Sequence, residues 1–138
     1  MAGRPDPQVD IGPVDDSCPL VVCANQMPDQ PIIYASPAFL ELTGYKQSEV
    51  LGQNCRFLQA PGGKVKAKSV RKHVNKDTIK TIRKAVERGK ELQIEVPNFR
   101  KDGSRFTNFL SVIPIQWDTD EFALSVGFQC DLEALYAV

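Results

Sequence analysis

The segment Gly52-Gln53-Asn54-Cys55-Arg56-Phe57-Leu58-Gln59 carries more information about this 138-residue chain than any other stretch. The Cys55 thiol lies between an amide and a guanidinium, and a second amide follows four residues later. Amides both donate and accept hydrogen bonds, which suits a ligand with a fixed polar edge, whereas arginine suits phosphate or carboxylate. A free cysteine on a short helix is more commonly a small packed side chain. Taken alone, the segment leaves both interpretations open.

Two short strands and a helix are predicted before this segment. Apolar residues 20–24 and 32–35 have strand length, and turn-forming residues separate them, which predicts a hairpin. Ser36-Pro37 predicts the start of a helix with Ser36 as its N-cap, and Gly44 should end that helix. We expect Ser48 to cap a further short helical turn.

A basic segment follows at residues 62–76. It holds no acidic residue but six basic ones, namely Lys64, Lys66, Lys68, Arg71, Lys72 and Lys76. A solvated surface loop is the common explanation of such a charge run. The alternative is a loop that closes over an anion such as a phosphate group.

The rest of the chain predicts one helix and three strands. Residues 77–88 have helical periodicity, with Asp77 as the cap, and residues 92–96 alternate as a half-buried strand does. Strands at 105–117 and 122–131 complete the pattern. Two strands, a helical stretch and three strands predict an α+β domain, in which helices cover one face of a five-stranded antiparallel sheet. A pocket would lie between the two layers.

Three amides belong to the predicted sheet. Asn98 and Asn108 lie on the two strands of a hairpin, where they can be neighbours, and Gln129 lies on the last strand. Buried amides are costly when they lack partners. They either bond one another and the backbone, or they hold the polar edge of a planar heterocycle.

Composition restricts the class of protein. The length fits one domain, and 17 basic residues balance 17 acidic ones, which argues against nucleic-acid binding by the whole domain. No apolar run has membrane-spanning length, and no secretory signal is visible. We therefore expect an intracellular protein, cytoplasmic or nuclear, with four reduced cysteines. With His73 as the only histidine, no metal site is expected.

The segment at 52–59 resembles the signature of light-oxygen-voltage (LOV) domains, a subfamily of the PAS domains. The resemblance covers roughly residues 17–131 and is closest to fungal blue-light photoreceptors. It includes residues 31–36, 42–45, 82–85, 98–103 and 127–129 in the same order. It implies a PAS/LOV fold built around a flavin pocket. Residues 1–16 would be an N-terminal arm, residues 60–76 an insertion and residues 132–138 a C-terminal tail. Met1-Ala2-Gly3 suggests an added start, and we expect a piece excised from a longer protein.

The resemblance also implies a function and a set of site residues. The domain would be a blue-light photoreceptor and not an enzyme, with Cys55 forming a reversible light-driven bond to flavin carbon C4a. Gln129 would lie near flavin N5 and O4, and its amide rotation would report the protonation of N5. The other flavin contacts would be Asn54 and Gln59 to the flavin or its ribityl chain, Asn98 and Asn108 at the pyrimidine edge, and Arg56 and Arg83 at the phosphate nearest the ribityl chain. The competing hypothesis is a PAS-type interaction module without photochemistry.

The insertion extends these expectations to the cofactor and the partners. Fungal relatives carry such an insertion around the adenine half of FAD, so FAD is expected, although the pocket could accept FMN. Arg71 is the leading candidate for the second phosphate, ahead of Lys66 and Lys68. Signalling would proceed through a conformational change or a light-enhanced homodimer, or through a PAS/LOV partner. No membrane and no direct nucleic-acid contact is expected. Cys18 and Cys23 are expected to be packed side chains, with Cys23 lining either the pocket or the outer sheet face.

Overall fold

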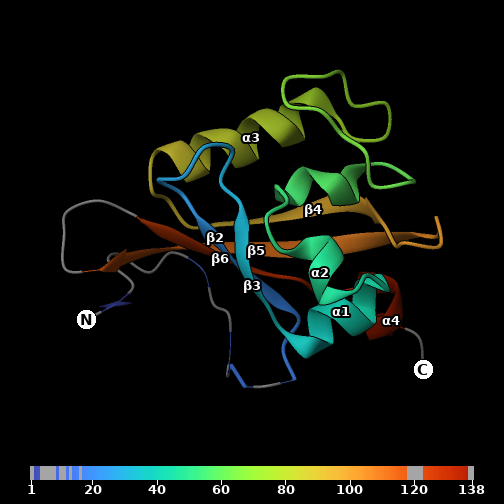
Figure 1. Ribbon diagram of the computed structural model, residues 1–138, viewed down its shortest axis with the longest axis horizontal. Coiled ribbons are helices and arrows are strands. Elements are labelled where there is room, and N and C mark those ends of the chain that lie inside the picture. Colours follow the sequence, from blue (N-terminus) through green and yellow to red (C-terminus); the bar gives the residue numbers. More distant parts are fainter. Residues whose placement is uncertain are drawn as a thin grey trace.

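The computed structural model describes residues 2–3, 9, 12, 14–15, 17–117 and 123–136. Its helices and strands are, in chain order, β1 (Ala2–Gly3), β2 (Leu20–Ala24), β3 (Ile32–Ala35), α1 (Pro37–Thr43), α2 (Gln47–Val50), the 3₁₀ helix η1 (Cys55–Gln59), α3 (Lys76–Glu87), β4 (Leu92–Phe99), β5 (Arg105–Trp117), β6 (Leu124–Phe128) and α4 (Leu132–Tyr136). In Figure 1, α3 and the green loop after η1 lie on the opposite side of the view from α1 and α2.

The predicted five strands form one antiparallel sheet, and the α+β prediction is confirmed. The strand order is β4-β5-β6-β2-β3. Of these five strands, β2 comes first in the chain and β6 last, and the two pair in the centre of the sheet. An addition to the prediction is β1, in which Ala2 and Gly3 pair with Trp117 and Gln116 of the long strand β5. The central position of β2 and β6 places their side chains beneath the helical layer.

The start and end of α1 follow the sequence closely. Ser36 has extended backbone angles and its hydroxyl accepts a hydrogen bond from the Phe39 amide at 3.2 Å. The same hydroxyl accepts from the Leu20 amide and donates to the Cys18 carbonyl, both at 2.9 Å, which fastens the helix to β2. Gly44 ends the helix at φ 79°, a conformation that favours glycine. Sequence and structure agree here because the cap is local chemistry.

Four predicted boundaries are wrong or lie outside the described residues. Ser48 lies inside α2, and Lys46 is its N-cap. Asn75, and not Asp77, caps α3, because its side chain accepts from the Asp77 amide at 2.7 Å. Gln129 follows β6, which ends at Phe128. The predicted strand start at Phe122 lies outside the described residues.

The core lies between the sheet and the helices α1, α2 and η1. It joins three sheet residues to four residues of the helices, namely Val21, Ile32 and Ala35 with Phe39, Val50, Phe57 and Leu58. The helix α3 differs, because it contacts β4 but contains no buried residue. Its apolar face, formed by Ile79, Ile82 and Val86, is only half-buried. This face of α3 therefore keeps exposed apolar surface that a further apolar group, such as a bound ligand, can cover.

Candidate functional site

The strand registers place the predicted polar residues on one face of the sheet. Val96 pairs with Asn108, and Asn98 lies two residues further on the same face. Val112 of β5 pairs with Gly127 of β6, and Gly127 pairs with Val21 of β2. By the same alternation, Cys23 of β2 shares the face of Val21. Since Val21 belongs to the core beneath the helices, this is the face that the helical layer covers.

Cys55 reaches this face from the helical layer. It is the first residue of η1, whose N-cap is Asn54. Its Sγ lies 3.6 Å from the Sγ of Cys23, and both cysteines are only partly buried although they pack against the core. The structure therefore resolves the alternatives for Cys23, which points into the interior beside Cys55 and not toward the outer face.

The two thiols differ in acidity. The hydrogen bond between the two sulfurs lowers the pKa of Cys23, because a neighbouring thiol stabilises the Cys23 thiolate. The same contact, together with burial, raises the pKa of Cys55 well above its usual value. Either sulfur can donate in this contact, and the raised pKa keeps Cys55 a thiol and not a thiolate at neutral pH.

The three sheet amides lie at the other end of this face. Asn98, Asn108 and Gln129 are buried, with exposed fractions of 5%, 2% and 6%. Asn108 donates to the side-chain oxygen of Asn98 at 2.9 Å and accepts from the Cys130 amide at 3.1 Å. Asn98 also donates to the Pro97 carbonyl, and Gln129 donates to the Gly127 carbonyl. The two asparagines are thus neighbours, as predicted.

These hydrogen bonds leave some donors and acceptors of the three side-chain amides unused. An amide side chain offers two N–H donors and an oxygen with two lone pairs. Each of the three amides uses one N–H, and the Gln129 oxygen accepts no bond from any residue that the structure describes. Beside it, Gly127 has no side chain, and a Cβ there would touch Val21, Gln129 and Leu110 at 3.4 to 3.7 Å. The unused N–H groups and the Gln129 oxygen therefore form a polar edge that a planar ligand can bind.

Asn54 and Arg56 are held by a residue that the sequence did not single out. Asn54 accepts from the Arg56 amide at 3.0 Å and donates to the Asp29 carbonyl at 2.7 Å. The Arg56 guanidinium makes a two-point ion pair with the Asp29 carboxylate and donates to the Val65 carbonyl. This pair lowers the pKa of Asp29. Asp29 belongs to a predicted turn 27 residues before Arg56, so no local pattern could have revealed the contact. The predicted flavin contacts of Asn54 and Arg56 stay predictions.

Arg71 and Gln59 meet in a pocket of the insertion. Arg71 Nε donates to Gln59 Oε1 at 3.0 Å, and the two residues line a pocket of about 180 Å³ with Lys64, Lys72 and His73. Burial lowers the pKa of Arg71, and the neighbouring charge of Arg56 lowers it further. Two close guanidinium groups and two lysines make an environment suited to an anion. Lys66 and Lys68 do not line this pocket, and Arg83 is an exposed residue of α3.

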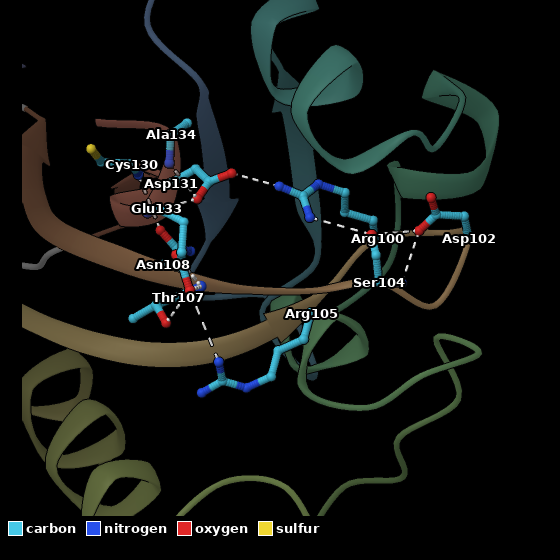
Figure 2. Close-up of polar contacts among 10 residues, drawn as sticks. All are labelled: Arg100, Asp102, Ser104, Arg105, Thr107, Asn108, Cys130, Asp131, Glu133 and Ala134. Carbon is cyan, nitrogen blue, oxygen red and sulfur yellow. Dashed lines mark hydrogen bonds and ion pairs between the residues drawn. The ribbon is translucent and has the colours of Figure 1, made fainter. Parts of the chain in front are cut away.

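The amide end of the face is connected to α4. Figure 2 shows Asn108 close to Cys130 and Asp131, at the start of that helix. The Asp131 carboxylate accepts from Arg100 at 2.5 Å and from the Glu133 amide at 3.1 Å. Glu133 in turn accepts from the amide and hydroxyl of Thr107 at 3.0 and 2.8 Å. Asp131, two residues after Gln129, and the two sides of the β4–β5 hairpin thus hold α4 in place.

This arrangement fits a flavin. The unused amide groups match the donor and acceptor edge of an isoalloxazine, and the half-buried apolar face of α3 suits its rings. Cys55 and Cys23 are core-contacting but partly exposed, which is the expected state of side chains that border space for a ligand. The arginines at the insertion suit the phosphates.

Comparison with known proteins agrees with the fold and identifies the family. Residues 17–134 match the PAS domain family. The White collar 1 protein of Neurospora crassa is 47% identical over 132 residues, which is 96% of this chain but only 11% of that protein. The light-state dimer structure of the fungal blue-light photoreceptor Vivid is 58% identical, with a TM-score of 0.88, and the match covers 92% of this chain and 86% of that one. A structure of a fungal LOV domain photoreceptor is 38% identical, with a TM-score of 0.76 and coverage of 93% and 83%.

A membrane-spanning helix is not found in the part of the chain that the structure describes.

Proposed function

This chain belongs to the PAS family and, within it, to the LOV domains of fungal photoreceptors, and on that premise we propose that it senses blue light through a flavin bound beside Cys55. The observation that carries the proposal is the placement of Cys55 and the three buried amides around one interior face. When bound, the flavin absorbs blue light and offers its C4a carbon to a thiol. The chain supplies the sulfur, the proton and the binding groups.

Cys55 delivers both the sulfur and a proton. Its pKa is raised by the contact with Cys23 and by burial, so it holds its proton in the dark. A thiol that keeps its proton can release it as the sulfur forms a bond, and the energy comes from the photon.

Gln129 carries the change away from the site. Its amide donates to the Gly127 carbonyl and its oxygen has no partner among the described residues, so rotation of the amide breaks one hydrogen bond and is driven by new bonds to the flavin edge. Rotation exchanges a donor for an acceptor at the flavin edge. Cys130 and Asp131 follow directly, and Asp131 caps α4, so a shift of Gln129 is transmitted to that helix.

We propose FAD as the cofactor, with FMN as an acceptable substitute. The pocket lined by Gln59, Arg71, Lys64 and Lys72 lies in the insertion, where a second phosphate would need cations. Arg71 is the proposed phosphate contact, and Arg56 and Arg83 are proposed for the nearer phosphate. Chromatography of the flavin released by heat denaturation tests the assignment, with FAD expected and FMN alone contradicting it.

We propose that light strengthens a homodimer or a contact with another PAS or LOV domain. The similar Vivid protein has a structure described as a light-state dimer, which supports the proposal. Light scattering in darkness and under blue light tests it, and an equal mass in both conditions at high concentration would contradict it. Because the chain spans 11% and 15% of two curated relatives, the activity of any longer protein is a proposal as well. We place the domain inside the cell, in the cytoplasm or nucleus, where reducing conditions preserve its free thiols.

The visible spectrum before and after blue light separates this function from its rivals. A photosensor should be yellow, bleach on illumination and recover in darkness without consuming a substrate. A PAS interaction module without photochemistry would be colourless after purification. A flavin redox enzyme would stay yellow and bleach only when a reducing substrate is supplied.

A further inference from the structure

The contact between Cys23 and Cys55 joins distant parts of the chain. The sulfurs are 3.6 Å apart although the residues are separated by 32 positions, in the central strand β2 and in η1. No other pair of cysteine sulfurs is in contact among the described residues, and all four cysteines are free thiols. The photochemistry proposed above uses Cys55 and gives Cys23 no part.

We propose that Cys23 and Cys55 form a redox pair, in which a peroxide joins the two sulfurs in a disulfide and so removes Cys55 from the light reaction. The loss of the light response rests on the proposed function, whereas the formation of the disulfide does not. The chemical class of the oxidant is a hydroperoxide, of which hydrogen peroxide is the smallest.

The contact assigns different roles to the two sulfurs. The sulfurs lie 3.6 Å apart, and this contact lowers the pKa of Cys23, which makes Cys23 the better source of a reactive thiolate. The Cys23 thiolate attacks one peroxide oxygen, the O–O bond breaks, and Cys23 becomes a sulfenic acid while hydroxide leaves. Cys55 then attacks the Cys23 sulfur and gives up its proton, and water leaves as the disulfide forms. In sum, two thiols and one hydrogen peroxide give one disulfide and two waters.

The local geometry permits this step. A disulfide has sulfurs about 2.05 Å apart, so the pair must approach by roughly 1.5 Å from its present 3.6 Å. Cys55 begins a short 3₁₀ helix, whereas Cys23 lies on a strand that pairs regularly with β6 and is irregular only toward the edge strand β3, so Cys55 makes most of the approach. Both side chains are partly exposed, which gives a small oxidant access.

Light and oxidant then compete for one sulfur. A Cys55 sulfur bonded to the flavin cannot join Cys23, and a Cys55 sulfur bonded to Cys23 cannot join the flavin. Oxidation therefore makes a population of the protein insensitive to light, and a thiol reductant restores it. Illumination during exposure to peroxide protects the thiols from being linked.

Peptide mapping by mass spectrometry under non-reducing conditions tests the disulfide directly. The flavin-loaded protein is treated in the dark with hydrogen peroxide, and free thiols are then blocked with an alkylating agent. We expect one linked pair of peptides that contain Cys23 and Cys55, lighter than their sum by two hydrogens. The bleach should fall in proportion to the linked fraction and return after treatment with dithiothreitol. Illumination during the peroxide step should lower the linked fraction.

Cys23→Ser and Cys18→Ser variants provide the test and its control. In the Cys23→Ser variant, peroxide should cause no reversible loss of the bleach relative to the same variant without peroxide. The Cys18→Ser variant should respond to peroxide as the original chain does. Alkylated Cys23 and Cys55 after treatment, or sulfinic acid on Cys55 without a linked peptide, would overturn the proposal. If the untreated protein never bleached, the proposed function would fail, while the peptide map would still decide the redox pair.

Discussion

Replacing Asn108 by alanine should destabilise the domain far more than the loss of an average polar side chain. Asn108 is 2% exposed, donates to the Asn98 oxygen and accepts from the Cys130 amide. Alanine leaves two buried groups without partners, each costing about 1–3 kcal/mol, and partial relaxation reduces the sum to about 2–4 kcal/mol. At about 3–5 °C per kcal/mol for a chain of this size, the melting temperature should fall by roughly 6–20 °C.

Urea unfolding followed by circular dichroism measures this change, using flavin-free protein so that ligand binding does not contribute. Arg105→Ala is the matched control in the same strand. Arg105 is 53% exposed and its nitrogen is 4.0 Å from Glu133, so its removal should cost about 0–1 kcal/mol. A free energy of unfolding within about 0.5 kcal/mol of the original protein would refute the reasoning, because two buried polar groups without partners cost more than that.

Gly44→Ala should lower the stability by about 1 kcal/mol in the same assay, because alanine is strained at φ 79°, whereas an unchanged midpoint would contradict this. Asp29→Asn should reduce stability at pH 7 but not in acid. The folded pKa of Asp29 lies below its unfolded value, so its ion pair with Arg56 contributes above the unfolded pKa of about 3.9 and is lost as pH falls through the folded pKa. Equal losses at pH 7 and pH 2 would rule this out. Arg71→Glu should weaken FAD at least about tenfold relative to Lys66→Glu while leaving riboflavin binding unaffected, as measured by fluorescence titration. Equal losses for both ligands would show that Arg71 does not contact a phosphate.

Local chemistry was predictable from the sequence, and distant contacts were not. The Ser36 cap, the Gly44 stop and the β4–β5 hairpin follow from neighbouring residues, and the structure shows each of them. The neighbourhood of Asn98 and Asn108 also followed, because a hairpin fixes which residues face each other. The caps at Lys46 and Asn75 were missed although local bonds mark both, since Glu49 accepts from the Lys46 amide and Asn75 accepts from the Asp77 amide.

The site depends on contacts that no local pattern encodes. Asp29 belongs to a turn, yet it holds both Asn54 and Arg56 from 25 to 27 residues away. Cys23 and Cys55 meet because one core cluster joins Val21 of β2 to Phe57 and Leu58 of η1. Such contacts are set by the strand order, and the order joins strands from the two ends of the chain.

The difference spectrum between darkness and blue light, compared for Cys55→Ala and Cys130→Ala variants, tests the central claim most directly. Cys130 is also a partly buried thiol, so it controls for the general loss of a cysteine. We predict that both variants purify yellow, that Cys130→Ala bleaches and recovers in darkness, and that Cys55→Ala does not bleach. A Cys55→Ala protein that bleached to the same product spectrum would contradict the assignment of the light reaction to Cys55.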